Sequence, residues 1–110
     1  MSDQNEPLSL QWQVEIKRIM EAVLWYVLTG TRGGPNRVRL LQAINERPRN
    51  ANQFAEALDL DYTTIRHHLE VLIDNGMVRK SGGDYGAVYL TTEQVDHHWE
   101  TVETISEQVE

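Results

Sequence analysis

The stretch FAEALDLDYTTIRHHLEVLIDNGMV, residues 54–78, decides the fold. A helix is predicted to begin after Asp61, which is a good N-cap residue, with Leu60 and Ile65 spaced as a hydrophobic staple. Apolar residues then recur at three- and four-residue steps, and Gly76 is placed to cap the C-terminus. The stretch therefore contains one complete amphipathic helix with a marked start and end.

A shorter helix precedes this one. It is predicted for residues 51–58, because Asn50 can cap it and Gln53 stands at the capping-box position. Only Asp59 and Leu60 separate the two helices. Two helices joined by so short a turn form a helix-turn-helix.

A β-hairpin is predicted directly after the second helix. Two short runs, residues 77–80 and 87–90, flank the turn-rich segment SGGDYG. A hairpin in this place is the wing of a winged helix-turn-helix. We therefore expect a mainly α fold with a small β-hairpin wing.

Three more helices are expected around this centre. The first covers about residues 8–29, and its second half is apolar almost all round, which indicates burial on more than one side. Another begins at Pro35 and ends before Pro48, with Val38, Leu41 and Ile44 as its inner stripe. The last is expected from Thr91 to about residue 109, with Thr91 as its cap and the spacing of a coiled-coil seam.

The composition limits the classes of protein that the chain can belong to. A length of 110 residues fits one domain, and no apolar run approaches the length that a membrane-spanning helix needs. The N-terminus is acidic and unlike a secretory signal, so we expect a cytoplasmic protein. The absence of cysteine excludes disulfides, cysteine-ligated zinc and thiol-based redox sensing.

The net charge of −7 is unevenly distributed. Residues 32–80 carry eight basic and six acidic side chains, whereas residues 81–110 carry seven acidic side chains and no basic one. A local basic surface in the middle segment is what contact with phosphates requires. Eight of the ten cations are Arg, and so acidic and lysine-poor a chain is typical of a very salty cytoplasm.

Residues 54–78, together with Tyr89, Leu90 and Thr91 after the wing, resemble ArsR-like winged-helix regulators. The resemblance covers about residues 35–92. The whole chain is similar to small regulators of halophilic archaea, including PadR-like and reactive-oxygen-response types. This resemblance implies a sequence-specific transcriptional regulator. Such a regulator would bind a pseudo-palindromic promoter site in double-stranded DNA as a homodimer.

The sequence patterns and the resemblance together divide the chain and its site residues by role. Residues 1–7 are expected to be a disordered tail, and residues 8–110 one domain, with a DNA-binding core at 35–90 and dimerisation helices at 8–29 and 91–109. The positions that match base-reading residues are Tyr62, Thr63, Arg66 and His67. Contacts to phosphate or through the wing are expected from Arg37, Arg49, Asn50, Asn52, Gln53, Thr64, Arg79 and Lys80.

The outer helices are expected to join two subunits through apolar residues. These are Trp12, Ile16, Val23, Val27, Val95, Trp99, Val102 and Ile105. An effector pocket lined by Trp25, Tyr26 and Trp99 is the alternative use of the aromatic residues, and a dimer core is the favoured one.

Other functions fit the residues less well. Asp96 and His98 match the start of the zinc site that some ArsR-like regulators carry, but its second half would fall on Val109, which cannot ligate. We therefore expect neither a metal nor a cofactor. An enzyme is disfavoured because no nucleophile–base set or phosphate loop is evident. A winged-helix module that binds proteins in a transcription complex is the main alternative, and an acidic chain makes a non-specific chromosomal protein the weaker one.

Overall fold

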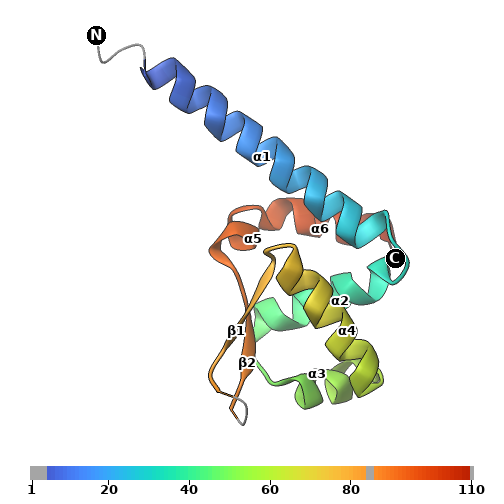
Figure 1. The fold of residues 1–110 in the computed structure, drawn as a ribbon. Coiled ribbons are helices and arrows are strands. Elements are labelled where there is room, and N and C mark those ends of the chain that lie inside the picture. Colours follow the sequence, from blue (N-terminus) through green and yellow to red (C-terminus); the bar gives the residue numbers. More distant parts are fainter. Residues whose placement is uncertain (1–4, 84–85, 110) are drawn as a thin grey trace.

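The computed structural model describes the backbone of residues 5–83 and 86–109, and it confirms the predicted fold class. The helices are α1 (Asn5–Thr29), α2 (Gly34–Glu46), α3 (Ala51–Leu58), α4 (Tyr62–Asp74), α5 (Glu93–His97) and α6 (Trp99–Val109). The strands β1 (Val78–Ser81) and β2 (Val88–Thr91) form one antiparallel hairpin (Figure 1). Residues 1–4 of the expected tail lie outside the described residues, and residues 5–7 belong to α1, which corrects that prediction.

One hydrophobic core holds these elements together. Helices α2, α3 and α4 surround Phe54, Leu41 and Leu69, each of which is almost completely buried. The last turns of α1 and both C-terminal helices close the core from the other side. The core thus anchors the inner face of α4 and leaves its outer face to solvent.

The helix-turn-helix begins and ends where the capping residues predicted. Asn50 and Gln53 form a reciprocal capping box at the start of α3, and Asp61 accepts a hydrogen bond from the backbone N–H of Thr63 at the start of α4. Asp59 takes a left-handed conformation, with φ of 54°, between the two helices. Gly76 follows α4 with φ of 72°, a backbone conformation that glycine adopts without strain.

The wing lies close to the N-terminus of α3. Its register places Arg79 opposite Leu90 and Lys80 opposite Tyr89. The backbone N–H of Tyr89 also donates to the carbonyl of Arg49, just before α3, at 3.0 Å. This bond holds the wing beside the helix-turn-helix.

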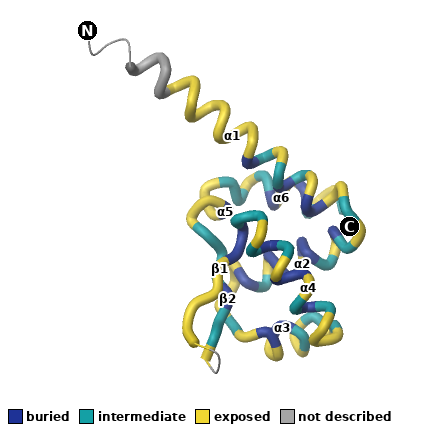
Figure 2. Tube along the Cα trace, in the orientation of Figure 1, coloured by how far each residue is buried: buried dark blue, intermediate teal, exposed yellow. Residues whose placement is uncertain are grey.

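Helix α1 is packed at one end and projects at the other. Its C-terminal half packs on α6, where the hydroxyl of Thr101 donates to a carboxylate oxygen of Glu21 at 3.0 Å. Its N-terminal half extends beyond the body, and its described side chains are exposed (Figure 2). The molecule therefore has a compact body with a helical arm.

The C-terminal segment differs from the prediction in two respects. It forms two helices instead of one, because the backbone at His98 leaves helical geometry with φ of −114° and ψ of 25°. The cap is Thr92, one residue after the predicted Thr91, and its hydroxyl accepts from the N–H of Val95.

Four of the expected dimer-interface residues are enclosed within this single chain. They are Val27, Val95, Val102 and Ile105. Their spacing is helical as predicted, but the side chains face the core of the same chain. They therefore cannot contact a partner. Val23 and Trp99 are partly buried, whereas Trp12 and Ile16 are exposed on the arm.

Candidate nucleic-acid interface

Helix α4 presents a polar face at its N-terminal half. Tyr62, Thr63 and His67 are exposed, and Arg66 is partly exposed, as is Thr64. All four predicted base-reading residues therefore reach the surface of this one helix.

Arg66 is held in place by a neighbour one turn earlier. Its guanidinium donates to the hydroxyl of Tyr62 at 3.0 Å and lies 5.8 Å from the centre of the Tyr62 ring. This hydrogen bond, assisted by the charge distribution around it, raises the pKa of Arg66. The pair forms a cationic, hydrogen-bonding surface that stays charged at any physiological pH.

A hollow of about 160 Å³ lies where α3, α4 and the wing meet. Its lining is mostly polar and comes from all three elements: Asn50, Ala51, Asn52, Tyr62, Arg66, Lys80, Ala87 and Tyr89. The N-terminus of α3 adds backbone N–H groups, which favour an anion. A phosphate oxygen fits the chemistry of this lining.

Tyr89 belongs to the hollow although the sequence did not single it out as a site residue. Its signal was the strand periodicity, because a residue paired with Lys80 across an antiparallel ladder points to the same face. Tyr89 is nearly buried, and so it forms the floor of the hollow.

Partners within the chain already engage three of the predicted phosphate contacts: Asn50, Gln53 and Arg49. Gln53 is engaged with Asn50 in the capping box. The guanidinium of Arg49 lies 5.0 Å from the centre of the Phe54 ring and donates to the carbonyl of Ala43 at 3.1 Å. These contacts leave Arg49 mainly a structural role, since only 12% of its side chain is exposed.

The prediction that Arg37 contacts phosphate is wrong. Its side chain is buried between α1, α2 and α4, with 3% of the residue exposed, and all its hydrogen bonds are internal. Arg37 precedes Leu41 by four residues, and so the helical period itself places it on the buried side of α2.

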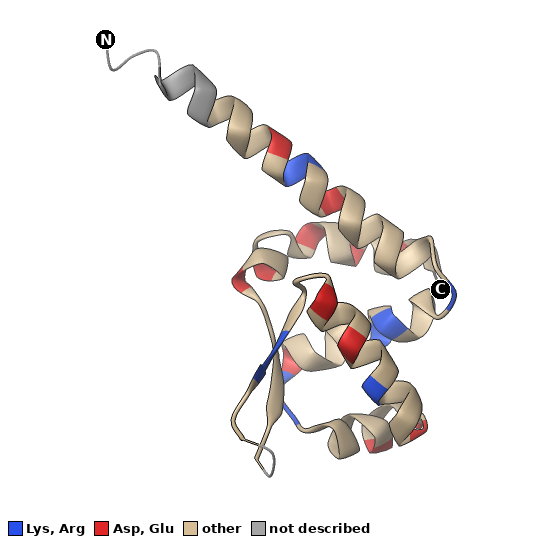
Figure 3. Ribbon diagram, viewed as in Figure 1, with Lys and Arg blue, Asp and Glu red and all other residues tan. Residues whose placement is uncertain are grey.

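Charge is unevenly distributed over the surface. Helices α5 and α6 carry acidic residues and no Lys or Arg, β1 carries Arg79 and Lys80, and α4 carries both signs (Figure 3). The described residues contain no group of three or more His, Cys, Asp or Glu placed to hold a metal ion. None of the helices in this part of the chain is long and apolar enough to cross a membrane.

Residues 34–80 match the family model described as bacterial regulatory protein, arsR family. The matched segment runs from the start of α2 into β1 and so contains the whole helix-turn-helix. This segment is therefore similar to the DNA-binding part of the arsR family, and we call residues 34–80 the ArsR-type segment. The predicted resemblance is confirmed at this level, and transcriptional regulation is the function of that family.

Solved structures share the fold of the ArsR-type segment and the helices around it. The homodimeric winged helix-turn-helix domain Mb0332 from Mycobacterium bovis, a possible ArsR-family regulator, has a TM-score of 0.64 and 19% identity over 81% of this chain and 80% of its own. An ArsR-like regulator from Rhodococcus sp. RHA1 has a TM-score of 0.61 and 18% identity over 84% of both chains. The oxidized form of MarR from E. coli has a TM-score of 0.61 and 14% identity over 89% of this chain and 73% of its own. No curated protein sequence matches the chain.

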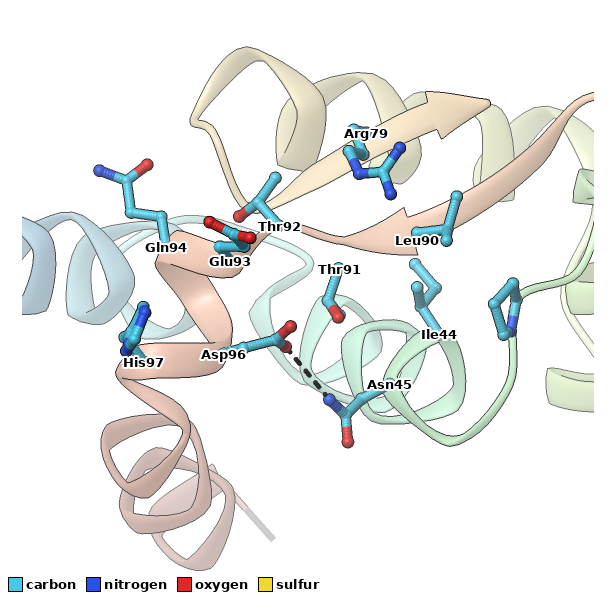
Figure 4. Close-up of a pocket in the computed structure, with 11 residues that line it drawn as sticks. Ile44, Asn45, Arg79, Leu90, Thr91, Thr92, Glu93, Gln94, Asp96 and His97 are labelled. Atoms are coloured by element: carbon cyan, nitrogen blue, oxygen red, sulfur yellow. Dashed lines mark hydrogen bonds between the residues drawn. The ribbon is translucent and has the colours of Figure 1, made fainter. Parts of the chain in front are cut away.

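The wing of the ArsR-type segment separates its two adjacent cations. Lys80 lines the hollow beside α4, whereas Arg79 lines a different and larger cleft of about 980 Å³ on the other side of the hairpin. Figure 4 shows Arg79 in this cleft with Glu93, Asp96 and His97. Successive strand residues point to opposite faces, so only Lys80 joins the base-reading candidates.

Proposed function

We propose that the protein is a sequence-specific DNA-binding transcriptional regulator that acts as a homodimer on a pseudo-palindromic promoter site. The observation that carries this proposal is the polar hollow shared by α3, α4 and the wing, beside the exposed face of α4. The hollow can accept a phosphate of the DNA backbone. The exposed polar face of α4 lies beside it and can enter the adjacent major groove.

In this proposal α4 enters the major groove. Arg66, His67, Tyr62 and Thr63 would contact base edges, because they are the hydrogen-bonding residues on its exposed face. Phosphates would lie against the N-terminus of α3 and against Lys80, with Thr64 at the edge of the groove. The acids Glu70 and Asp74 follow later in α4 and would stay outside the groove.

The second subunit would pack against the arm of α1. An apolar seam runs along this helix at alternating four- and three-residue steps: Trp12, Ile16, Ile19, Val23 and Tyr26. Trp12, Ile19 and Tyr26 are 67%, 58% and 65% exposed. Heptad spacing of this kind is the pattern of a helix that pairs with another helix, and a second copy supplies an identical seam.

A homodimer also explains the expected symmetry of the DNA site. Two copies of α4 related by a twofold axis would enter successive major grooves, about 34–36 Å apart. The homodimeric state of Mb0332, which has the same fold, supports this arrangement. Occupation of promoter DNA would then regulate transcription.

We further propose that the protein works in the cytoplasm of a halophilic archaeon. The support is the net charge of −7, together with ten cations of which eight are Arg. A high density of surface carboxylates keeps a protein soluble in concentrated salt. Its resemblance to reactive-oxygen-response regulators suggests the class of signal.

The decisive experiment titrates the purified protein against the duplex from upstream of its own gene, beside a scrambled duplex of equal length, in molar potassium chloride. Selective binding with two protomers per site is expected. Equal binding to both duplexes, or none, would contradict sequence-specific regulation and favour a protein-binding winged helix.

A further inference from the structure

Arg37 is a buried cation without an acidic partner. None of the ion pairs in the described part of the chain involves it, and only neutral groups accept its hydrogen bonds. A guanidinium is costly to remove from water, and this burial lowers the pKa of Arg37. The hydrogen bonds that Arg37 makes to other elements must therefore account for its burial.

One side of the guanidinium joins the end of α1. Its Nε donates to the carbonyl of Val27 at 3.1 Å, in the last turn of that helix. Its Nη2 donates to the carbonyl of Arg32 at 2.8 Å and to the hydroxyl of Thr31, both in the linker that leads to α2. The positive charge therefore caps the negative end of the α1 dipole.

The other side joins α4. Nη1 donates to Nδ1 of His68 at 3.2 Å, and His68 is 5% exposed on the inner face of that helix. Because arginine cannot accept a hydrogen bond, Nδ1 must be unprotonated, and the neutral ring carries its proton on Nε2. A Cβ on Gly33 would lie 2.8 Å from Cε1 of His68, so a side chain at this position would collide with the ring.

His68 follows Arg66 and His67 on the same helix. A rotation or shift of α4 that releases His68 would therefore move both base-reading candidates. We propose that Arg37 and His68 are positioning residues, a latch that fixes α4 relative to the end of α1 and so sets the placement of the base-reading face. This inference rests on the proposed function and adds to it a physical connection between the dimerisation arm and the DNA-reading helix.

Acid would open the latch. The charged or titratable groups that face His68 are Arg37 from α2 and His67 from its own helix, whereas α1 and the linker contribute the neutral groups named above. Burial in the first place, and then the charge of Arg37, lower the pKa of His68. A protonated His68 would lose its acceptor at Nδ1 and face the positive charge of Arg37.

The first test compares His68→Asn with His68→Leu at pH 7.5 on the upstream duplex. The Asn side-chain oxygen can occupy the place of Nδ1 and keep accepting from Arg37, whereas Leu leaves the donor unpaired. We expect His68→Leu to lower the affinity about tenfold and His68→Asn to stay within about threefold of the wild type. Equal affinities for His68→Leu and the wild type would overturn the latch.

The second test separates positioning from phosphate contact. Arg37→Gln should weaken binding without changing the slope of log affinity against log salt concentration, because no phosphate contact is lost. Lys80→Gln is the matched control and should shift that slope by about one. A slope change of the same size in Arg37→Gln would refute positioning.

A pH series completes the test. Below the pKa of His68 the wild type should lose affinity by up to about tenfold per pH unit, since one proton is taken up, and His68→Asn should lose less. The ratio of the two affinities at each pH isolates the contribution of residue 68. Identical pH profiles would overturn the latch.

A DNA-free measurement keeps this inference separate from the proposed function. Hydrogen exchange of folded His68→Leu should accelerate in α4 and in the last turn of α1, while α6 keeps its protection. If the wild type binds no DNA but α4 loosens in this way, the regulator assignment fails and the structural latch stands. Unchanged exchange in α4 would overturn the latch itself.

Discussion

At the scale of single residues, the side chain of Arg66 is restricted by a neighbour on its own helix. Its hydrogen bond to Tyr62 and its position over the Tyr62 ring restrict a side chain that otherwise has many rotamers. Less conformational entropy is then lost when it binds a base edge. The Tyr62–Arg66 pair is therefore a preorganised element of the proposed interface.

Arg66→Ala should weaken binding to the upstream duplex by about 1–3 kcal/mol, the range for a good bidentate base contact. The loss on a scrambled duplex should be smaller, because non-specific binding depends mainly on phosphates. Fluorescence anisotropy with both duplexes measures the difference. A matched control is Arg79→Ala, which removes an arginine from the other side of the wing. An equal loss on both duplexes would show that Arg66 does not read bases.

His68 makes the stability of the fold depend on pH. Its pKa is lower in the folded protein than in the unfolded chain, so folding favours the neutral ring. The corresponding stability is complete above about pH 6.5, the unfolded value, and is lost as the pH falls through the lower folded value. Urea unfolding at a series of pH values should show this loss in the wild type. A His68→Asn variant that loses as much stability over the same window would disprove the assignment to His68.

At the scale of elements, the two faces of the wing carry different cations, both from β1. Lys80 faces the hollow beside α4, and Arg79 faces the cleft toward α5. Lys80→Ala should therefore reduce affinity for all duplexes and shift the salt slope by about one, whereas Arg79→Ala should leave the slope unchanged. Titrations at four salt concentrations are sufficient. The reverse result would mean that DNA approaches the wing from the α5 side.

Helix α1 carries the prediction about assembly. The substitutions Ile16→Glu and Ile19→Glu each place a charge in the apolar seam. Each should therefore convert the proposed dimer to a monomer. The body should stay folded, because both side chains are exposed in the single chain. Analytical ultracentrifugation and circular dichroism measure the two effects. Gln13→Glu, on another face of the same helix, is the control, and a dimer that tolerates all three changes would place the interface elsewhere.

Sequence patterns predicted some elements better than others, for physical reasons. Caps are local, so Asn50 and Asp61 marked the starts of α3 and α4 correctly. Periodicity gives the apolar side of a helix but not its partner, and for this reason Val102 and Ile105 were assigned to a second subunit instead of their own core. The break at His98 has no glycine or proline to announce it.

The site was predictable to a similar extent. The exposed face of α4 follows from its apolar period, and Tyr62, Thr63, Arg66 and His67 reach the surface as expected. The helical period places Arg37 on the buried side of α2, but its charge favoured a phosphate contact. The acceptors that satisfy its buried guanidinium come only from the tertiary fold: the end of α1 and His68. Long-range contacts of this kind leave no local signal.

At the scale of the whole molecule, the acidic surface and the proposed DNA interface lie on different parts of one body. The molecule measures 56 × 34 × 20 Å, and the acids of α6 lie on the helix that packs against α1, whereas the hollow lies where α3, α4 and the wing meet. This distribution should orient the protein, since phosphates repel the wholly acidic α5 and α6 more strongly than the mixed-charge surface around the hollow.

Salt should therefore act on this protein in an unusual way. A cationic DNA-binding protein gains affinity by releasing counterions, and its affinity falls steeply as salt rises. With a net charge of −7 per chain, close approach to DNA would instead require uptake of cations between carboxylates and phosphates. We expect affinity for the upstream duplex to stay level or rise as potassium chloride increases from about 0.1 M to molar concentration, where the Debye length falls to about 3 Å.

The test uses the acids of α6. Replacing Glu100, Glu103 and Glu107 together by Gln removes three charges from exposed positions and leaves the buried Val102 and Ile105 in place. The variant should bind more tightly than the wild type at low salt, and its slope should become more negative, because fewer cations are taken up on binding. A conventional negative slope in the wild type, unchanged in the variant, would show that the acidic surface serves solubility alone.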